Sequence, residues 1–237
     1  MNENPVTDTE VVLFSGVDTE LLRRCQALRY RVYHHDLGLD TPDLDHALGI
    51  DVEARDGACD FAATLDAHGE VVGCLRMQPP GTRPFYAELE FDLLGEDWSS
   101  LAHVEGARFA VARGARNGPV PLLLFQAFRR YCRAEGVDHV LSVAIVRGEL
   151  HDRAHGARLT RWLRERTLFS PRRGRPARGY ELAPFDAEEL AGAGPPTAAE
   201  ISPMLRLFAN RRTTLCSEPA YCRRFGTFNF LLSTRLG

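Results

Sequence analysis

Lysine is absent from this 237-residue sequence, and all 29 of its basic residues are arginine. That absence excludes catalysis through a lysine Schiff base and a P-loop that holds phosphate with lysine. The six cysteines never form a C-x-x-C pair, so neither a zinc site nor a disulfide framework is predicted. No apolar run reaches the roughly 18 residues of a membrane-spanning helix, and the acidic N-terminus MNENPVTDTE is not a secretory signal. We expect a protein of the reducing cytoplasm, with no bound metal.

The charges are unevenly distributed along the chain. The formal net charge is only −3, yet ten arginines and three acids lie between Arg147 and Arg178. Such a local excess suits a negatively charged partner, although a solvated face has the same composition. Because the whole chain is slightly acidic, nucleic acid is not expected to be that partner.

Hydrophobic periodicity predicts alternating strands and helices. Helices are expected over 18–38, with Asp18 or Thr19 as the N-cap, over 119–136 and over 157–169, and one more is expected near the C-terminus. Strands are expected at 10–15, as a hairpin within 60–80, and at 103–112, 138–146 and 179–185, with two more near the C-terminus. With no repeat and no clear boundary, this order predicts a single mixed α/β domain over residues 1–237.

One stretch, VEGARFAVARGARNGPVPLLL at 104–124, joins a strand to a helix through a turn with glycine and arginine. Unpaired N–H groups at a helix start attract anions, and Arg116 adds a full charge beside Gly118. The same pattern is also common in ordinary loops that connect a strand to a helix. The spacing alone leaves both interpretations open.

Several motifs carry a resemblance to a known superfamily. E-x-x-R-F-A-V at 105–111 resembles the signature of autoinducer synthases, which belong to the acetyltransferase-like (GNAT) superfamily. LRYRVYHHDLGLD resembles that family's opening helix and carries Arg29 and Tyr33. Glu53 and Asp56 lie in the similar stretch DVEARD, and Arg76 ends EVVGCLR.

Other stretches resemble a sister family, the ornithine-lipid (hemolysin-like) N-acyltransferases. They are DVEARDGACDFAATLD, FYAELEFDLLG and the C-terminal ISPMLRLF with CSEPAYCRRFGTFNFLL. The resemblance covers most of residues 20–234. Phe61 replaces the histidine of this sister family, Asn229 replaces its aspartate, and Leu39 replaces the tryptophan of the autoinducer synthases.

The resemblance implies a GNAT-like (acyl-CoA N-acyltransferase) fold, a mixed central sheet flanked by helices. It also implies transfer of an acyl group from a thioester of acyl carrier protein or coenzyme A to an amine, ornithine being typical. No permanent cofactor is expected. The backbone of Phe109, Ala110 and Val111 would pair with the acyl-phosphopantetheine arm, whose phosphate would lie near Arg116 and Gly118.

The resemblance also suggests residue roles. Glu105 would take the proton from the amine, because an α-amino group with a pKa near 8 is mostly protonated at neutral pH. Arg108 would organise Glu105 or bind a substrate carboxylate, and the alternative is a simple structural pair of the two. A substrate-binding network is implied for Arg29, Tyr33, Glu53, Asp56 and Arg76. Its alternative is a set of surface salt bridges of small energetic value.

Partners and competing functions follow from the same residues. The Arg-rich segment at 147–178 would dock an acidic acyl carrier protein, or it would lie on a membrane as a peripheral contact, since Trp162, Leu163, Leu168 and Phe169 stand among its arginines. A second function is an acyl-homoserine-lactone (autoinducer) synthase that uses S-adenosylmethionine. A third, suggested by Phe61 and Asn229, is a non-catalytic acyl-carrier-binding module.

Overall fold

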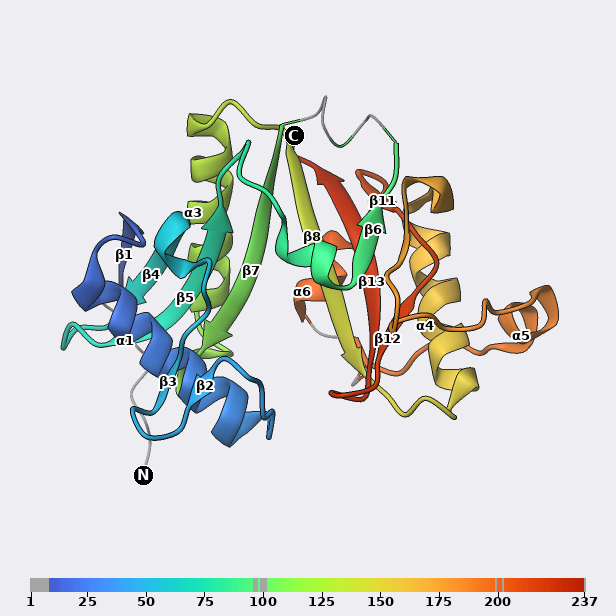
Figure 1. The fold of residues 1–237 in the computed structure, drawn as a ribbon, viewed down its shortest axis with the longest axis horizontal. Helices are drawn as coiled ribbons and strands as arrows, with labels where there is room; N and C mark the ends of the chain where they lie inside the picture. The colour runs from blue at the N-terminus through green and yellow to red at the C-terminus, as the bar shows by residue number, and fades with distance from the viewer. Residues whose placement is uncertain (1–8, 96–97, 99–101, 199, 202, 237) are drawn as a thin grey trace. The chain divides into compact units, whose positions relative to one another are not determined.

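The computed structural model describes residues 9–95, 98, 102–198, 200–201 and 203–236 (Figure 1). The chain divides into two compact units: unit 1 is Met1–Pro80 with Gly106–Val137, and unit 2 is Gly81–Glu105 with Asp138–Gly237. Strand β7 (His103–Val111) contributes its first three residues to unit 2 and the others to unit 1. The single domain expected over 1–237 stays a prediction.

Unit 1 is built on strands β1 (Glu10–Ser15), β4 (Asp60–Leu65), β5 (Val71–Gln78) and β7, in that order. The pairs β1–β4 and β4–β5 are antiparallel, which confirms the predicted hairpin. Helices α1 (Thr19–Tyr30) and α3 (Val120–Ala134) cover opposite faces of β5, as Figure 1 shows. Alternation along the strand explains this: Cys74 donates to the Cys25 carbonyl of α1, whereas a Cβ at Gly73 would meet Val120 and Leu124 of α3.

The predicted first helix begins and ends for local reasons. The Asp18 side chain accepts the Leu21 N–H at 3.2 Å, as expected for an N-cap. A wider π-helical turn, η1 (Arg31–Asp36), continues α1. Short elements complete the unit: the strand pair β2 (Leu44–Asp45) and β3 (Ile50–Asp51), and the 3₁₀ turns η2 (Asp56–Ala58) and η4 (Arg113–Ala115).

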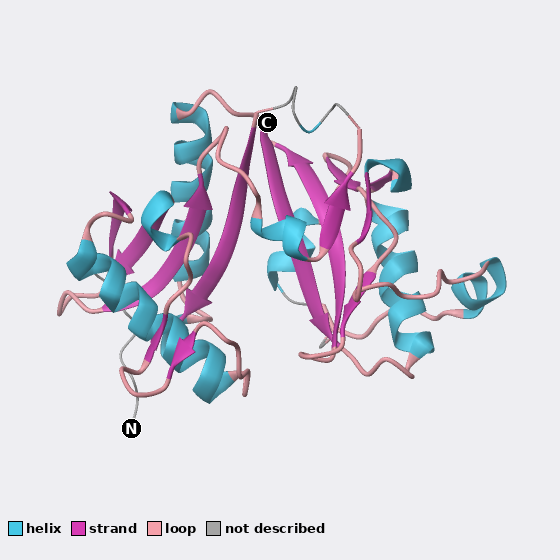
Figure 2. Ribbon diagram, viewed as in Figure 1, coloured by secondary structure: helices cyan, strands magenta, loops and turns pink. Residues whose placement is uncertain are grey.

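Unit 2 contains a mixed sheet (Figure 2). The first residues of β7 pair in parallel with β8 (His139–Arg147), and β8 pairs antiparallel with β13 (Thr227–Arg235). Beyond β13 lie β11 (Thr213–Leu215) and then β9 (Leu168–Phe169), while β12 (Ala220–Cys222) also pairs with β13.

The two faces of β13 have different covers. Phe228, Phe230 and Leu232 point to one face and pack with Leu159 and Leu163 of α4 (Arg153–Arg166). The alternate residues point to the other face, where Leu231 packs with the segment that includes η3 (Tyr86–Leu89) and β6 (Phe91–Leu93). The remaining elements are η5 (Pro171–Arg173), β10 (Gly174–Pro176), which pairs with β6, and the short helices α5 (Ala187–Gly192) and α6 (Pro203–Phe208).

The mixed sheet flanked by helices confirms the predicted fold class. The strand expected over 179–185 is wrong, since residues 181–185 have no regular structure. That stretch is held by isolated bonds such as Tyr221 N–H to the Tyr180 carbonyl at 2.8 Å, and Pro184 has no N–H for a ladder. No helix in the described part of the chain is long and apolar enough to cross a membrane.

Candidate functional site

The charged network predicted around Arg29 exists in unit 1 and is buried; we call it the charge cluster (Arg29, Asp51, Glu53, Asp56 and Arg76). Arg29 is 0% exposed and donates to both carboxylate oxygens of Asp56, at 2.6 and 3.1 Å. The same guanidinium donates to the Asp51 carbonyl at 2.6 Å and to its side chain at 3.2 Å. Arg29 therefore joins α1 to both ends of the acidic loop at 51–56.

The rest of the charge cluster comes from β5 and the loop. Arg76, 1% exposed, pairs with Glu53 and donates to Asp56 at 3.2 Å. Gln26, one turn before Arg29 on α1, donates to Asp56 at 3.0 Å. Since these side chains are almost fully enclosed, the alternative of a surface salt-bridge set is wrong.

The acids of the charge cluster titrate differently. Burial alone would raise the pKa of Asp56, but hydrogen bonds and charge from Arg29 hold it below its ordinary value. At Glu53, burial likewise acts to raise the pKa, but the charge and hydrogen bond of Arg76 act against it, and the pKa lies below its ordinary value. At Asp51 burial prevails over Arg29 and Arg108, and the pKa is raised.

Arg108 extends the charge cluster to strand β7. Its guanidinium donates to Asp51 at 2.9 Å and to Asp43 at 2.5 Å. It also lies 6.0 Å from the ring centre of Tyr33, whose hydroxyl donates to the Phe109 carbonyl at 3.4 Å. Both terminal nitrogens of Arg108 thus contact carboxylates of the chain itself.

The backbone of β7 departs from regular strand geometry at this point. Arg108 has φ 54°, the left-handed region that residues with a side chain rarely adopt. Residues 106–109 are half-buried, whereas 103–105 and 110–111 on either side are mostly buried. Such strain tends to mark a functional segment. The middle of β7 is therefore irregular and partly accessible within the E-x-x-R motif.

Glu105, the predicted proton acceptor, lies in unit 2 and is 2% exposed. One carboxylate oxygen accepts the Ala87 N–H at 2.7 Å, and the other accepts the Tyr86 N–H. These are the first N–H groups of η3, so Glu105 anchors that turn. Its proposed role in proton transfer stays a prediction, and both oxygens already have donors.

The predicted phosphate turn also has internal bonds. Arg116 donates from Nε to the Val111 carbonyl at 3.0 Å and pairs through Nη2 with Asp36. Within the turn, the N–H groups of Ala115 and Gly118 donate to backbone carbonyls at 2.9 and 3.2 Å. The donors left for an anion include the N–H groups of Arg116, Asn117, Val120 and Leu122, at and just before the start of α3.

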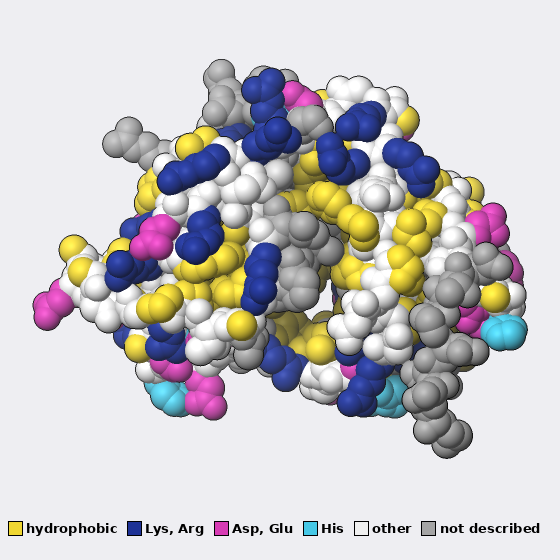
Figure 3. All heavy atoms as spheres, turned by 180° about the vertical axis from the view of Figure 1, so that it is seen from behind, with side chains coloured by type: hydrophobic (Ala, Val, Ile, Leu, Met, Phe, Trp, Pro, Cys, Tyr) yellow, Lys and Arg dark blue, Asp and Glu magenta, His cyan; other side chains and the backbone are white. Residues whose placement is uncertain are grey.

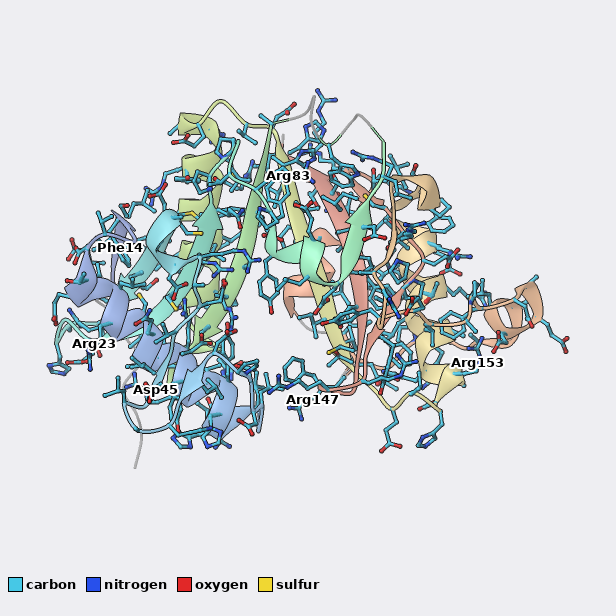
Figure 4. The ribbon with its side chains drawn as sticks, in the orientation of Figure 1. Phe14, Arg23, Asp45, Arg83, Arg147 and Arg153 are labelled. Atoms are coloured by element: carbon cyan, nitrogen blue, oxygen red, sulfur yellow. The ribbon has the colours of Figure 1, made fainter. Side chains whose placement is uncertain are left out.

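Two departures from the family pattern have structural explanations. Phe61 is fully buried and stacks on Phe14 at 5.3 Å, so it fills the core of unit 1; Figure 4 labels Phe14 on β1. Asn229 is 1% exposed and donates from Nδ2 to Glu90 at 2.6 Å. Glu90 is not among the predicted site residues, although the stretch FYAELEFDLLG contains it.

The Arg-rich segment is less charged in space than in sequence. Arg153, labelled in Figure 4, pairs with Glu189, Arg158 with Glu200, and Arg164 with Glu218. Arg161 pairs with Glu165 on its own helix and also donates to carbonyls of the 190–193 segment. Figure 3 accordingly shows arginines spread over the visible face rather than gathered in one patch.

The described residues contain no group of three or more His, Cys, Asp or Glu side chains placed to hold a metal ion. The six cysteines are all free and buried.

Comparison with known proteins supports the resemblance that the motifs predict. Residues 28–126 match the family model of the acetyltransferase (GNAT) domain. A curated relative, the L-ornithine N(alpha)-acyltransferase of Rhodobacter capsulatus, is 27% identical over an alignment 141 residues long, and the match covers 55% of this chain and 54% of the relative. The matched stretch thus spans about half the length of that relative. The predicted resemblance is confirmed.

Solved structures show the same fold. The CoA-dependent acyl-homoserine lactone synthase BjaI has a TM-score of 0.53 at 17% identity, over 97% of this chain and 84% of that one. TofI, in a ternary complex with an inhibitor and MTA, gives a TM-score of 0.52 at 16% identity, over 97% of this chain and 91% of the other. These likenesses confirm the GNAT-like fold.

Proposed function

We propose that the chain is an N-acyltransferase that moves a fatty acyl group from a thioester to the amine of an amino acid such as ornithine. One observation carries the proposal: the E-x-x-R segment of β7 is irregular, with φ 54° at Arg108, in a GNAT-like domain related to an ornithine acyltransferase. The product would be an N-acyl amino acid or lyso-lipid.

The chemistry needs a neutral amine beside the thioester carbon and donors for the developing oxyanion. For the pantetheine arm we keep the predicted backbone of Phe109, Ala110 and Val111 on β7. We assign the thioester to the half-buried residues 106–109, since a strand that is accessible there can pair with the arm. Arg108 pairs with Asp43 and Asp51 beside this backbone and lies near the ring of Tyr33, and the Asp43 side chain is 31% exposed. An accessible carboxylate there suits the cationic side chain of ornithine.

The donor is proposed to be an acyl carrier protein rather than free coenzyme A. The support is the arginine content of 147–178, together with the exposed Leu168 and Phe169 beside Arg164. All five arginines of α4 already have acidic partners, so the dock would have to recruit charges that are partly neutralised. The proposed location is the cytoplasm, with peripheral contact to a membrane, because a fatty product favours a membrane surface.

The second candidate, an acyl-homoserine-lactone synthase using S-adenosylmethionine, is favoured by the E-x-x-R-F-A-V motif. The ornithine acyltransferase relative favours the first candidate, because the chain matches it in sequence and its name describes the same kind of reaction. A non-catalytic carrier-binding module is the third.

One assay separates the three. Thiol release is followed with acyl carrier protein or acyl-CoA as the donor, and with ornithine, other amino acids or S-adenosylmethionine as the acceptor. Release with an amino acid supports the proposal, and lactone formation with S-adenosylmethionine supports the second candidate. Donor binding without release under any condition supports the third and overturns the proposal.

The donor phosphate is proposed to bind at Arg116 and the start of α3. Arg116→Ala should weaken donor binding by roughly 1.5–3 kcal/mol, the range for a hydrogen bond to a charged group. Titration calorimetry with coenzyme A measures this, and Arg113→Ala in the same turn is the control. The choice among amines should not change. Wild-type affinity in Arg116→Ala would leave the turn with a structural role only.

A further inference from the structure

A second polar group lies in unit 2, on the face of β13 opposite α4. Asn229 donates from Nδ2 to Glu90 Oε2 at 2.6 Å, and the two residues are 1% and 6% exposed. Glu90 Oε1 makes no hydrogen bond within the described part of the chain. One carboxylate oxygen is therefore fixed and the other is available.

The surrounding polar atoms are incompletely satisfied. Asn229 Oδ1 is buried and has no partner among the described residues, and the same holds for Thr227 Oγ1. Thr227 and Asn229 are two positions apart on β13, so their side chains share one face of the sheet. Buried acceptors without partners are rare in folded proteins and call for a ligand or an ordered water.

The backbone around Glu90 holds the carboxyl in place. Glu90 N–H donates to the Ala87 carbonyl at 3.1 Å, and the Glu90 carbonyl accepts the Ala177 N–H at 2.8 Å. Tyr180, three residues after Ala177, packs against the same apolar cluster as Phe91. A side chain anchored in this way has little freedom to find an internal partner for Oε1.

The face beside Asn229 is open. The residue opposite Asn229 on β8 is Ile145, whose side chain is 55% exposed. Arg147, labelled in Figure 4 at the end of β8, lies opposite Thr227. A small molecule can therefore approach these polar atoms along the exposed part of β8.

We propose that Glu90 accepts the proton of the acceptor amine, whose nitrogen binds between Glu90 Oε1 and Asn229 Oδ1. The ligand class is a primary amine, because its N–H groups match two oxygen acceptors that lack donors. Thr227 Oγ1 offers a further bond to the rest of the amine-bearing molecule. The inference rests on the proposed function. It assigns the role of base to a residue with an available carboxylate oxygen, whereas both oxygens of Glu105 already accept hydrogen bonds.

The transfer balances with this assignment. Glu90 takes one proton from the ammonium ion, and the neutral nitrogen attacks the thioester carbon. The C–N bond forms, the C–S bond breaks, and the nitrogen loses a second proton. One of the two protons goes to the leaving thiolate and the other to water. The products are an amide, a thiol and one released proton.

The titration of Glu90 fits the role. Burial raises the pKa of its carboxyl above the ordinary value, against the opposing effect of the Asn229 bond. A base whose pKa lies closer to neutral is better matched to an amine than an ordinary carboxylate. The charged or titratable groups from the neighbouring elements are Glu105 on β7, Arg147 on β8, Tyr180 after β10, Cys222 on β12 and Arg224 after it.

The test compares Glu90→Gln with Asp92→Asn, a matched control in the same segment that pairs with Arg175 in solvent. With the best amine found for the wild type, Glu90→Gln should lower kcat/KM by about 10²-fold or more and remove the acid limb of its pH profile. Asp92→Asn should change kcat/KM by less than about twofold, in line with the small worth of exposed pairs.

Asn229→Ala provides a second readout. It removes the bond that favours the charged carboxylate, so the acid limb should move to higher pH. An acid limb that belongs to the amine alone would stay in place in both variants. Calorimetric titration with the amine, without donor, should show weaker binding to Glu90→Gln, and thermal melts check that each variant folds.

The outcomes separate the two proposals. If the wild type releases thiol and Glu90→Gln keeps its rate and acid limb, the assignment of Glu90 is overturned and the acyltransferase function stands. If Glu90→Gln does not fold, an acid limb unmoved by Asn229→Ala overturns the assignment. If the wild type releases no thiol with any amine, the function itself fails, and the assignment fails with it.

Discussion

The charge cluster of unit 1 and the Glu90–Asn229 pair of unit 2 are both buried polar groups, yet they differ in how their acceptors are satisfied. Asp56 receives bonds from Gln26, Arg29 and Arg76. Glu90 receives one side-chain bond, and neighbouring acceptors of β13 have none within the described residues. A carboxylate whose oxygens all have donors holds the fold, whereas an acceptor without a donor has capacity for a substrate. Burial alone does not distinguish the two.

The largest expected effect lies in the charge cluster. Asp56→Ala leaves Arg29 and Arg76 without their shared carboxylate, and breaking a buried pair costs roughly 3–5 kcal/mol. Urea unfolding measures the loss. Asp92→Ala, which breaks the exposed pair with Arg175, should cost less than about 1 kcal/mol. Equal costs in the two variants would remove the distinction between a structural network and surface charges.

The next effect concerns Glu105. In Glu105→Gln one of the two η3 N–H groups faces an amide NH₂ instead of an oxygen, at a cost of about 1–3 kcal/mol for an unsatisfied buried donor. Thermal melts measure the stability, and thiol release measures turnover in parallel. A loss of turnover of about 10²-fold with unchanged melting would restore Glu105 as the proton acceptor.

The pH dependence of stability should differ in sign between the regions. Asp56 has a lowered folded-state pKa, so its stabilisation is present above its unfolded pKa and is lost as pH falls through the folded value. Glu90 has a raised pKa, so its contribution is fully present below its unfolded pKa and is lost as pH rises through the folded value.

Melting curves between about pH 2 and 8 therefore separate the two, because the change at Asp56 lies below its unfolded pKa near 4 and the change at Glu90 lies above its unfolded value. Relative to wild type, Glu90→Gln should gain stability as pH rises above about 4, whereas Asp56→Asn should lose stability as pH rises toward about 4 and then stay level. Parallel pH profiles for the two variants would contradict the assignment of opposite shifts.

The smallest effect is expected on the surface of α4. Arg161→Glu with Arg164→Glu should raise the apparent KM for an acyl carrier protein and leave kcat unchanged. Added salt should act likewise on the wild type, because charges are screened over about 8–10 Å at 0.1–0.15 M. Since these arginines already pair with Glu165 and Glu218, the change in KM should be modest. An unchanged KM in both experiments would exclude this surface as the dock.

The sequence predicted the long elements well because their signals are local. Asp18 caps α1 as expected, and β4 and β5 form the predicted hairpin. It also identified Arg29, Asp56 and Arg76 as a network, through motifs from three separate segments. The burial of these side chains could not be predicted from the sequence, since exposure depends on packing between distant segments.

Non-local partners explain the failures. The arginine excess at 147–178 is largely cancelled by Glu189, Glu200 and Glu218, which follow it in the sequence. The Glu90–Asn229 bond joins residues 139 positions apart, and neither residue has a local pattern that indicates the other. The strand expected at 179–185 did not form, and no strand in the described part of the chain pairs with it.

The buried cations of the charge cluster, Arg29 and Arg76, are both guanidinium groups, as is Arg108 beside the irregular stretch of β7. A lysine in any of these places would bring a primary amine into the interior of the proposed acyltransferase. An arginine remains protonated and is a poor nucleophile, so a reactive thioester finds no competing acceptor among these side chains. With no lysine anywhere in the sequence, the proposed enzyme is protected from acylating its own side-chain amines.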